Sequence, residues 1–170
     1  MFRVMKKTLL TGVVTEHFKI PRDEQLEQLG IEIKQGIDQR FSGSLAIRQV
    51  DAGSCNGCEL EIHALNNPYY DIERFGIHFV ASPRHADILL VTGPVSRHMQ
   101  TALLRTYHAT PDPKWVIAVG ECGACGGEFG VSYASCGAIA NVIPVDVVIP
   151  GCPPSPLALM SGILGLMKSK

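Results

Sequence analysis

Two closely spaced cysteines, in the segment GSCNGCELEI at residues 53–62, are the first candidates for chemistry in this sequence. Cys55 and Cys58 form a C-x-x-C pair. Such a pair can act as a redox disulfide, bind zinc with two further ligands, or supply half of a four-thiolate set for an iron–sulfur cluster. Which of these chemistries applies depends on the positions of the other four cysteines, Cys122, Cys125, Cys136 and Cys152.

The elements that would position these cysteines follow from the pattern of apolar residues. From Ser44 onward, strand patterns alternate with helix patterns, which predicts a flavodoxin-like α/β domain with an open, mostly parallel sheet and flanking helices. Helices are predicted after Cys58, over residues 95–109 and over about residues 154–167. The predicted strands are residues 44–50, 77–80, 86–93, 114–120 and 145–151.

Four of the cysteines follow the ends of three predicted strands. Cys55 and Cys58 follow the first strand, Cys122 follows the strand KWVIAVG, and Cys152 follows the strand VDVVIPG. Loops after the carboxyl ends of parallel strands meet at one edge of the sheet, where ligands bind. The sequence therefore predicts four thiols at one edge, and four thiolates are what a [4Fe–4S] cluster takes.

Two other interpretations of the cysteines stay open on spacing alone. A structural zinc site usually has two local C-x-x-C pairs, which would require Cys122 and Cys125 to form the second pair. A thioredoxin-like redox pair at the start of a helix would fit Cys55 and Cys58. That interpretation leaves the segments GECGACGG and PGCPP without a role.

Length and composition limit the class of protein. A chain of 170 residues is long enough for one domain with its own core, and six scattered cysteines are too few for a disulfide scaffold. The net charge of −1 and the absence of a basic cluster give no support for a nucleic-acid partner. The apolar C-terminal run PLALMSGILGLM is about half the length of a membrane span, and we expect a soluble, cytoplasmic chain.

The first 42 residues differ from the rest of the chain. The initial run MFRVMKKTLLTGVV resembles a signal peptide but lacks a cleavage site, and we do not interpret it as one. Residues 23–41 have an apolar spacing that is only partly helical, interrupted by Gly30 and Gly36. This segment is predicted to be either a helix packed on the domain, residues 43–170, or an N-terminal arm that contacts partner subunits or a membrane.

Four motifs in this order give the sequence a specific resemblance: GSCNGCE, SPRHADILLVTGPV, VGECGACGG and IPVDVVIPGCPPSP. They resemble the family that contains [NiFe] hydrogenase small subunits and the terminal-cluster subunit of complex I. The resemblance covers about residues 44–168. It implies that Cys55, Cys58, Cys122 and Cys152 bind one [4Fe–4S] cluster, the proximal cluster, and that the chain is an electron-transfer subunit of an oxidoreductase with no complete active site of its own.

Within this family the chain most resembles the membrane-bound, complex I-related hydrogenases, such as those of formate hydrogenlyase. Complex I subunits have adjacent cysteines at the first position, whereas this chain has Asn56 and Gly57 between them. The resemblance implies a [NiFe] large subunit, a ferredoxin-like iron–sulfur subunit and membrane-embedded antiporter-like or quinone-module subunits as partners. It implies a peripheral position on the cytoplasmic side of the cell membrane. The alternative is a complex I-like subunit that donates electrons to quinone.

Other polar residues carry weaker predictions. Glu59 follows a cysteine at the start of a predicted helix, where it can complement the helix dipole. The resemblance adds a role for Glu59 in tuning the cluster or moving protons. Cys125 and Cys136 are expected to be small buried residues, although Cys125 could replace Cys122 as a ligand. Asp146 lies inside an apolar run, so we expect it to have a partner.

Overall fold

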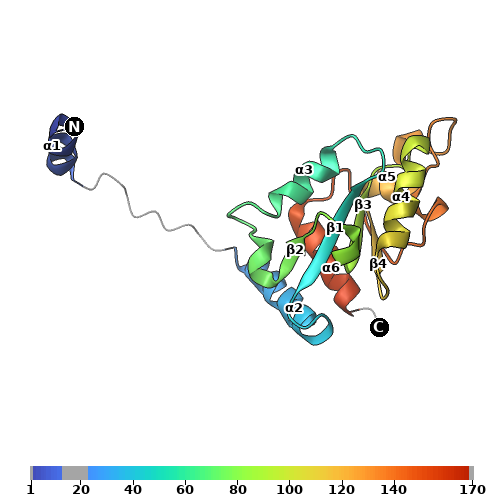
Figure 1. Ribbon diagram of the computed structural model, residues 1–170, viewed down its shortest axis with the longest axis horizontal. Helices are drawn as coiled ribbons and strands as arrows, with labels where there is room; N and C mark the ends of the chain where they lie inside the picture. The colour runs from blue at the N-terminus through green and yellow to red at the C-terminus, as the bar shows by residue number, and fades with distance from the viewer. Residues whose placement is uncertain (1, 13–22, 169–170) are drawn as a thin grey trace.

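The protein is an α/β domain built on one five-stranded sheet, as the computed structural model shows for residues 2–12 and 23–168 (Figure 1). All four strand pairs are parallel, and the strand order is β2-β1-β3-β4-β5. This is the flavodoxin-like order, so the predicted fold class is confirmed. The strands are β1 (Leu45–Asp51), β2 (Ile77–Phe79), β3 (Ile88–Thr92), β4 (Trp115–Val119) and β5 (Val147–Ile149).

Helices cover both faces of this sheet. The six α-helices among the described residues are α1 (Phe2–Thr11), α2 (Glu24–Arg40), α3 (Gly57–Ala64), α4 (Arg97–Ala109), α5 (Gly120–Cys125) and α6 (Pro156–Lys168). Short 3-10 helices are η1 (Ile72–Phe75), η2 (Pro83–His85), η3 (Gly127–Phe129) and η4 (Ile139–Asn141). Helices α2 and α6 pack on one face, and α4 packs on the other (Figure 1).

Strand β3 shows how the sequence builds two cores at once. All five of its residues are fully buried, because successive side chains of a strand point to opposite faces. Ile88 and Leu90 join the core under α2 and α6, while Leu89 and Val91 join the core under α4. A continuous apolar run is therefore the pattern that a central parallel strand needs.

Helix α2 belongs to the domain core. It begins at Asp23, whose carboxylate accepts hydrogen bonds from the backbone N–H groups of Gln25 and Leu26 at 3.0 and 3.2 Å. Its buried face includes Ile33 and Ile37, both fully inaccessible to solvent. Residues 24–40 therefore form a helix packed on the domain, which is the first of the two alternatives that the sequence left open. Residues 13–22 of the expected arm lie outside the described residues.

The two glycines that interrupt the α2 pattern lie where other elements press against the helix. A Cβ atom at Gly30 would collide with the ring of Phe75 in η1. One at Gly36 would lie 2.9 Å from Cβ of Met167 in α6. Because these two positions carry no side chain, Phe75 and Met167 can approach the helix backbone closely. The glycines therefore belong to the packed side of α2.

Two aspartates join neighbouring strands by hydrogen bonds at the amino-terminal edge of the sheet. The carboxylate of Asp87, just before β3, accepts a hydrogen bond from the N–H of Ala46 at 2.9 Å, and its own N–H donates to the Ala46 carbonyl at 2.8 Å. Asp146, just before β5, makes the same pair of bonds with Val116 at 2.7 and 2.9 Å. The expectation that Asp146 lies inside a strand is wrong: it is an exposed residue that precedes the strand, and its partner is a backbone N–H.

We predict that Gly30→Ala lowers the free energy of unfolding by about 1–3 kcal/mol, because the added methyl group overlaps the Phe75 ring. Gly165→Ala is the matched control, since Gly165 is also in a helix but has open space around its Cβ position. That change should be neutral or stabilising by about 0.5–1 kcal/mol. Urea unfolding measures both, and equal effects would contradict the packing argument.

We also predict that Asp146→Ala lowers the free energy of unfolding by about 1–3 kcal/mol, because Val116, which is 1% exposed, loses the acceptor for its N–H. Asp38→Ala tests the general effect of removing an aspartate. Asp38 is exposed in α2, and its side chain makes no hydrogen bond to any described residue, so its loss should change the free energy of unfolding by less than about 0.5 kcal/mol. Similar decreases in the free energy of unfolding for both variants would contradict the stabilising role of the Asp146–Val116 hydrogen bond.

Candidate metal centre

Four of the six cysteines line one small hollow at the carboxyl edge of the sheet. Cys55, Cys58, Cys122 and Cys152 come from the segments after β1, β4 and β5, and the hollow has about 340 Å³ of empty space, part of it open to solvent. These are the four cysteines that the sequence placed at one edge. The other lining residues are Ser54, Gly57, Gly93, Glu121, Gly151 and Pro153.

The segment between β1 and α3 is held by its own polar side chains. The carboxylate of Asp51, the last residue of β1, accepts hydrogen bonds from the N–H groups of Gly53 and Ser54, both at 2.8 Å. The Ser54 hydroxyl accepts a hydrogen bond from the Asn56 N–H at 3.1 Å. Asn56 has a left-handed backbone with φ of 72°, and α3 begins directly after it. Cys55 therefore lies before the helix and Cys58 lies in its first turn.

A two-point hydrogen-bonded link joins the segments that carry Cys122 and Cys152. The Glu121 carboxylate accepts a hydrogen bond from the Gly151 N–H at 3.2 Å, and the Glu121 N–H donates to the Gly151 carbonyl at 3.0 Å. Cys122 belongs to α5, which starts at Gly120 where β4 ends. The glycine-rich segment that follows β4 therefore begins with this short helix, Gly120–Cys125.

Two glycines leave space that the cysteine sulfurs need. A Cβ atom at Gly120 would lie 2.9 Å from Sγ of Cys58, and one at Gly127 would lie 2.7 Å from Sγ of Cys122. Both glycines also have positive φ angles, 77° and 53°, which favour glycine. The backbone thus approaches the sulfur atoms with no side chain between them. Four thiols in such a cradle are a donor set that fits a [4Fe–4S] cluster.

The other two cysteines lie outside this hollow. Cys136 is 7% exposed in the core under α4, with its Sγ 3.5 Å from the Gln100 side-chain oxygen. Cys125 is exposed at the end of α5, and its thiol donates to the Glu121 carbonyl at 3.2 Å. The expectation of a small buried residue is thus correct for Cys136 and wrong for Cys125. Cys125 does not line the hollow, whereas Cys122 does.

The electrostatics of the hollow disfavour free thiolates. Burial raises the pKa of the Cys58 thiol to about 11, and the negative charge of Glu59 and the three neighbouring thiols add to this. Burial also raises the pKa of Cys122. No lysine, arginine or histidine is among the described residues that line the hollow. A bound cation would supply the missing positive charge and favour the thiolates. No group of three or more His, Cys, Asp or Glu side chains in the described ranges is arranged to hold a single metal ion.

Glu59 is a buried carboxylate beside the thiol hollow. It is 5% exposed and lies in the first turn of α3, the position at which its charge can complement the helix dipole. One carboxylate oxygen accepts a hydrogen bond from the hydroxyl of Thr92, which is fully buried at the end of β3. The second oxygen, Oε2, is buried without a hydrogen-bond partner among the described residues. Thr92 was not predicted from the sequence. Its signal is a hydroxyl that ends an otherwise apolar strand.

The rim of the hollow is open and partly apolar. Cys55 and Cys152 are both exposed. Phe129 is 66% exposed and lines a shallow depression together with Gly53, two residues before Cys55. Val131 and Tyr133 follow in the same segment and are 70% and 98% exposed. Large side chains that are this exposed along one short segment are typical of a surface that a partner covers.

Taken together, a five-stranded parallel sheet with helices on both faces places the chain in the doubly wound α/β class, and the thiol-lined hollow lies at the carboxyl edge, where this class binds ligands. Residues 55–166, more than half of the chain, match the family described as the 20 kDa subunit of NADH ubiquinone oxidoreductase. The chain belongs to this family. In complex I, subunits of the family bind a [4Fe–4S] cluster.

Individual relatives place the chain among subunits of redox complexes. It is 45% identical over 154 residues to formate hydrogenlyase subunit 7 of Escherichia coli, an alignment that covers 89% of this chain and 60% of that protein. It is 51% identical over 115 residues to a probable membrane-bound hydrogenase subunit of Pyrococcus furiosus, covering 68% of this chain and 69% of that protein. The chain therefore spans less than two thirds of the Escherichia coli relative.

Solved structures agree on the architecture. A chain of an archaeal membrane-bound sulfane sulfur reductase superposes with a TM-score of 0.66 at 37% identity, covering 86% of this chain and 75% of that chain. A chain of an NAD⁺-reducing [NiFe]-hydrogenase has a TM-score of 0.56 at 18% identity, covering 73% and 91%, which shows a shared fold. The relatives are thus subunits of more than one kind of oxidoreductase complex.

We predict that Gly120→Ala reduces the iron bound after anaerobic reconstitution at least severalfold, because the added methyl group crowds Sγ of Cys58. Gly130→Ala is the matched control. Gly130 also has a positive φ, 49°, so its substitution also carries backbone strain, but nothing lies within 4 Å of its Cβ position. Iron per chain and circular dichroism together separate loss of metal from loss of fold. Equal iron in the two variants would contradict the proposed space requirement.

Proposed function

We propose that this chain holds one [4Fe–4S] cluster on Cys55, Cys58, Cys122 and Cys152 and relays single electrons. The electrons would pass between a [NiFe] site in a large partner subunit and clusters in a ferredoxin-like partner of a membrane-bound hydrogenase. The observation that carries the proposal is the convergence of these four thiols, from three strand ends, on one hollow without crowding side chains.

The residues of the chain hold the cluster and tune its surroundings. The paired bonds between Glu121 and Gly151 keep two ligand segments at a constant separation, and the Asp51 turn orients the third. A bound [4Fe–4S] cluster supplies one-electron chemistry, with a potential set by burial, nearby charge and hydrogen bonds to sulfur. Glu59 places a carboxylate directly after the ligand Cys58. We assign it a role in lowering the cluster potential or in holding a proton near the site.

The chemistry at hydrogen is assigned to the partner subunit. After four cysteines are committed to the cluster, only Cys125 and Cys136 remain, and these cannot supply the two C-x-x-C pairs that a nickel site of this class needs. We therefore assign no catalytic residue to this chain. It acts as a relay within a multisubunit oxidoreductase.

The exposure of the rim is the observation that favours a large partner subunit covering the cluster. On the chain alone, Cys55 and Cys152 are exposed, and a cluster bound there would meet solvent on one side. A partner that covers the rim and the apolar residues Phe129, Val131 and Tyr133 would exclude water and bring its own redox site within electron-transfer distance. We place the chain as a peripheral subunit on the cytoplasmic side of the membrane, attached to membrane-embedded antiporter-like or quinone-module subunits. No described helix is long and apolar enough to cross a membrane.

Two other reactions, reduction of a quinone and reduction of sulfur, are alternatives to hydrogen chemistry in the partner. The family match to the complex I subunit favours quinone, but the spacing Cys55-Asn56-Gly57-Cys58 differs from the adjacent cysteines of the complex I pattern. The similarity to a sulfane sulfur reductase chain favours a partner that acts on sulfur. In each case the cluster and its ligands on this chain are the same. The sequence of the co-purifying large subunit separates the cases, because two C-x-x-C pairs there indicate a nickel site.

We predict that Cys152→Ser lowers the iron and acid-labile sulfide content and removes the reducible paramagnetic signal of the anaerobically purified protein. Cys136→Ser is the matched control, because Cys136 lies in the core outside the hollow and should leave both readouts unchanged. The unaltered chain should contain four irons. Stoichiometric zinc without iron would refute the relay, and reversed effects of the two variants would refute the ligand assignment.

A further inference from the structure

Helix α1 is the one helix of the described chain that packs on nothing. Every residue from Phe2 to Gly12 is exposed, and α1 contributes no buried residue to the domain. A helix of ten residues is marginal in water by itself, because few hydrogen bonds offset the cost of nucleation. Its stability must therefore come from a surface that covers one of its sides.

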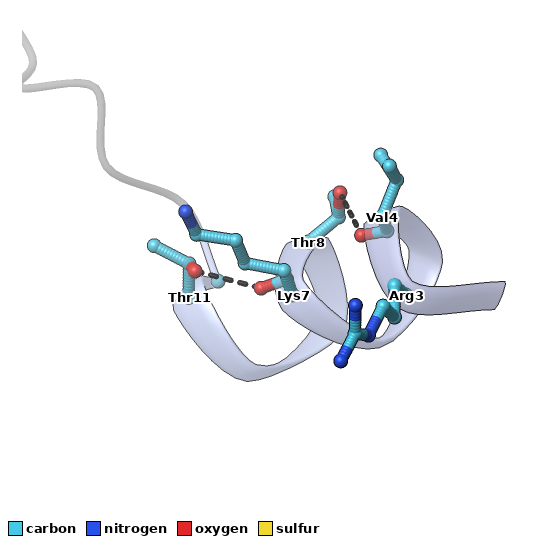
Figure 2. Close-up of a pocket in the computed structure, with 6 residues that line it drawn as sticks. Arg3, Val4, Lys7, Thr8 and Thr11 are labelled. Carbon is cyan, nitrogen blue, oxygen red and sulfur yellow. Dashed lines mark hydrogen bonds between the residues drawn. The ribbon is translucent and has the colours of Figure 1, made fainter. Parts of the chain in front are cut away.

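The side chains of α1 divide into two faces. Phe2, Met5 and Leu9 have the i, i+3, i+7 spacing of one helix face and are 89%, 54% and 82% exposed. Figure 2 shows the other face, where Arg3 and Lys7 project from the helix beside Thr8, Thr11 and one apolar residue, Val4. The apolar face is the side that gains free energy when it is covered.

The polar groups of α1 favour a lipid surface over a protein groove. The hydroxyls of Thr8 and Thr11 donate to the carbonyls of Val4 and Lys7 at 3.0 and 2.7 Å, so neither needs a partner from outside (Figure 2). Lys6 lies four residues after Phe2 and four before Leu10, at the border of the apolar face. A protein groove would have to supply a placed carboxylate for it. At a bilayer surface the flexible lysine stem can stay with the apolar side chains while the amine reaches the phosphates.

Charge selects the type of lipid. α1 carries Arg3, Lys6 and Lys7 and no acidic residue. Each cation near an anionic leaflet adds attraction, and aromatic and leucine side chains on the opposite face enter the boundary between headgroups and acyl chains. We propose that α1 lies flat on an anionic membrane surface, with Phe2, Met5 and Leu9 inserted and its cations at the lipid phosphates.

The dimensions fit this orientation. Ten residues make a helix of about 15 Å, half the thickness of the hydrocarbon core, so α1 can lie on a bilayer but cannot cross it. The eleven residue steps from Gly12 to Asp23 can span at most about 40 Å. Asp23 is held at the start of α2, where its carboxylate also accepts a hydrogen bond from the Tyr69 hydroxyl at 3.1 Å. The proposal therefore places the membrane within that reach of the first turn of α2.

Vesicle binding by the full chain tests this proposal. The chain should co-sediment with phosphatidylcholine vesicles that contain phosphatidylglycerol, bind several times more weakly to pure phosphatidylcholine, and dissociate as salt is raised. Leu9→Glu should reduce binding at least about tenfold, because it places a charge on the inserted face. Ile31→Glu is the matched control: Ile31 is 47% exposed on α2, so the same chemical change there should leave binding unaltered.

The outcomes separate this proposal from the electron relay. Equal binding to both kinds of vesicle, or equal binding of Leu9→Glu and the unaltered chain, would overturn it. So would a Leu9→Glu variant that is released from the detergent-solubilised complex, since that result assigns α1 to a protein partner. The iron content of Leu9→Glu should match that of the unaltered chain, because α1 contributes no residue to the thiol hollow.

Discussion

The common direction of the strands is the constraint on which the site depends. Because β1, β4 and β5 all run parallel to β3, the segments that follow them emerge at the same edge of the sheet. Three segments that lie far apart in sequence therefore place four thiols around one hollow. The fully buried strand β3 maintains this geometry, since its alternating side chains belong to both cores and fix the register of its two neighbours. Asp87 and Asp146 secure the opposite edge.

Much of this arrangement could be predicted from sequence because it depends on local apolar runs. The strand ILLVT and the strand WVIAV are continuous apolar runs that only a buried strand or helix tolerates, and turn residues bound them. Features that depend on distant contacts could not be read in the same way. Gly30 and Gly36 look like interruptions of α2 until Phe75 and Met167 are seen against them. α5 was hidden because glycine is a poor helix former, and tertiary packing overrides that preference.

The same distinction applies to the site. The four thiols at one edge followed from strand order, and their assignment as a ligand set followed from the family resemblance. The polar groups that hold their segments were not predictable, because each bond joins residues whose proximity only the fold creates. The pair Glu121 and Gly151 is separated by 30 residues, and Thr92 and Glu59 by 33. The exposure of Cys125 depends on where α5 ends.

The spread of the four cysteines along the chain has a consequence for biogenesis. The two apolar cores of the domain involve none of the four thiols of the hollow beyond a partial contact of Cys58. The polypeptide can thus acquire its shape before iron and sulfide arrive, unlike a zinc finger, in which the metal drives folding. Delivery of the inorganic atoms would then be a late maturation step on a prepared scaffold. Under the proposed function, loading of the cluster would precede the binding of any subunit that covers the rim, which would set an order of assembly.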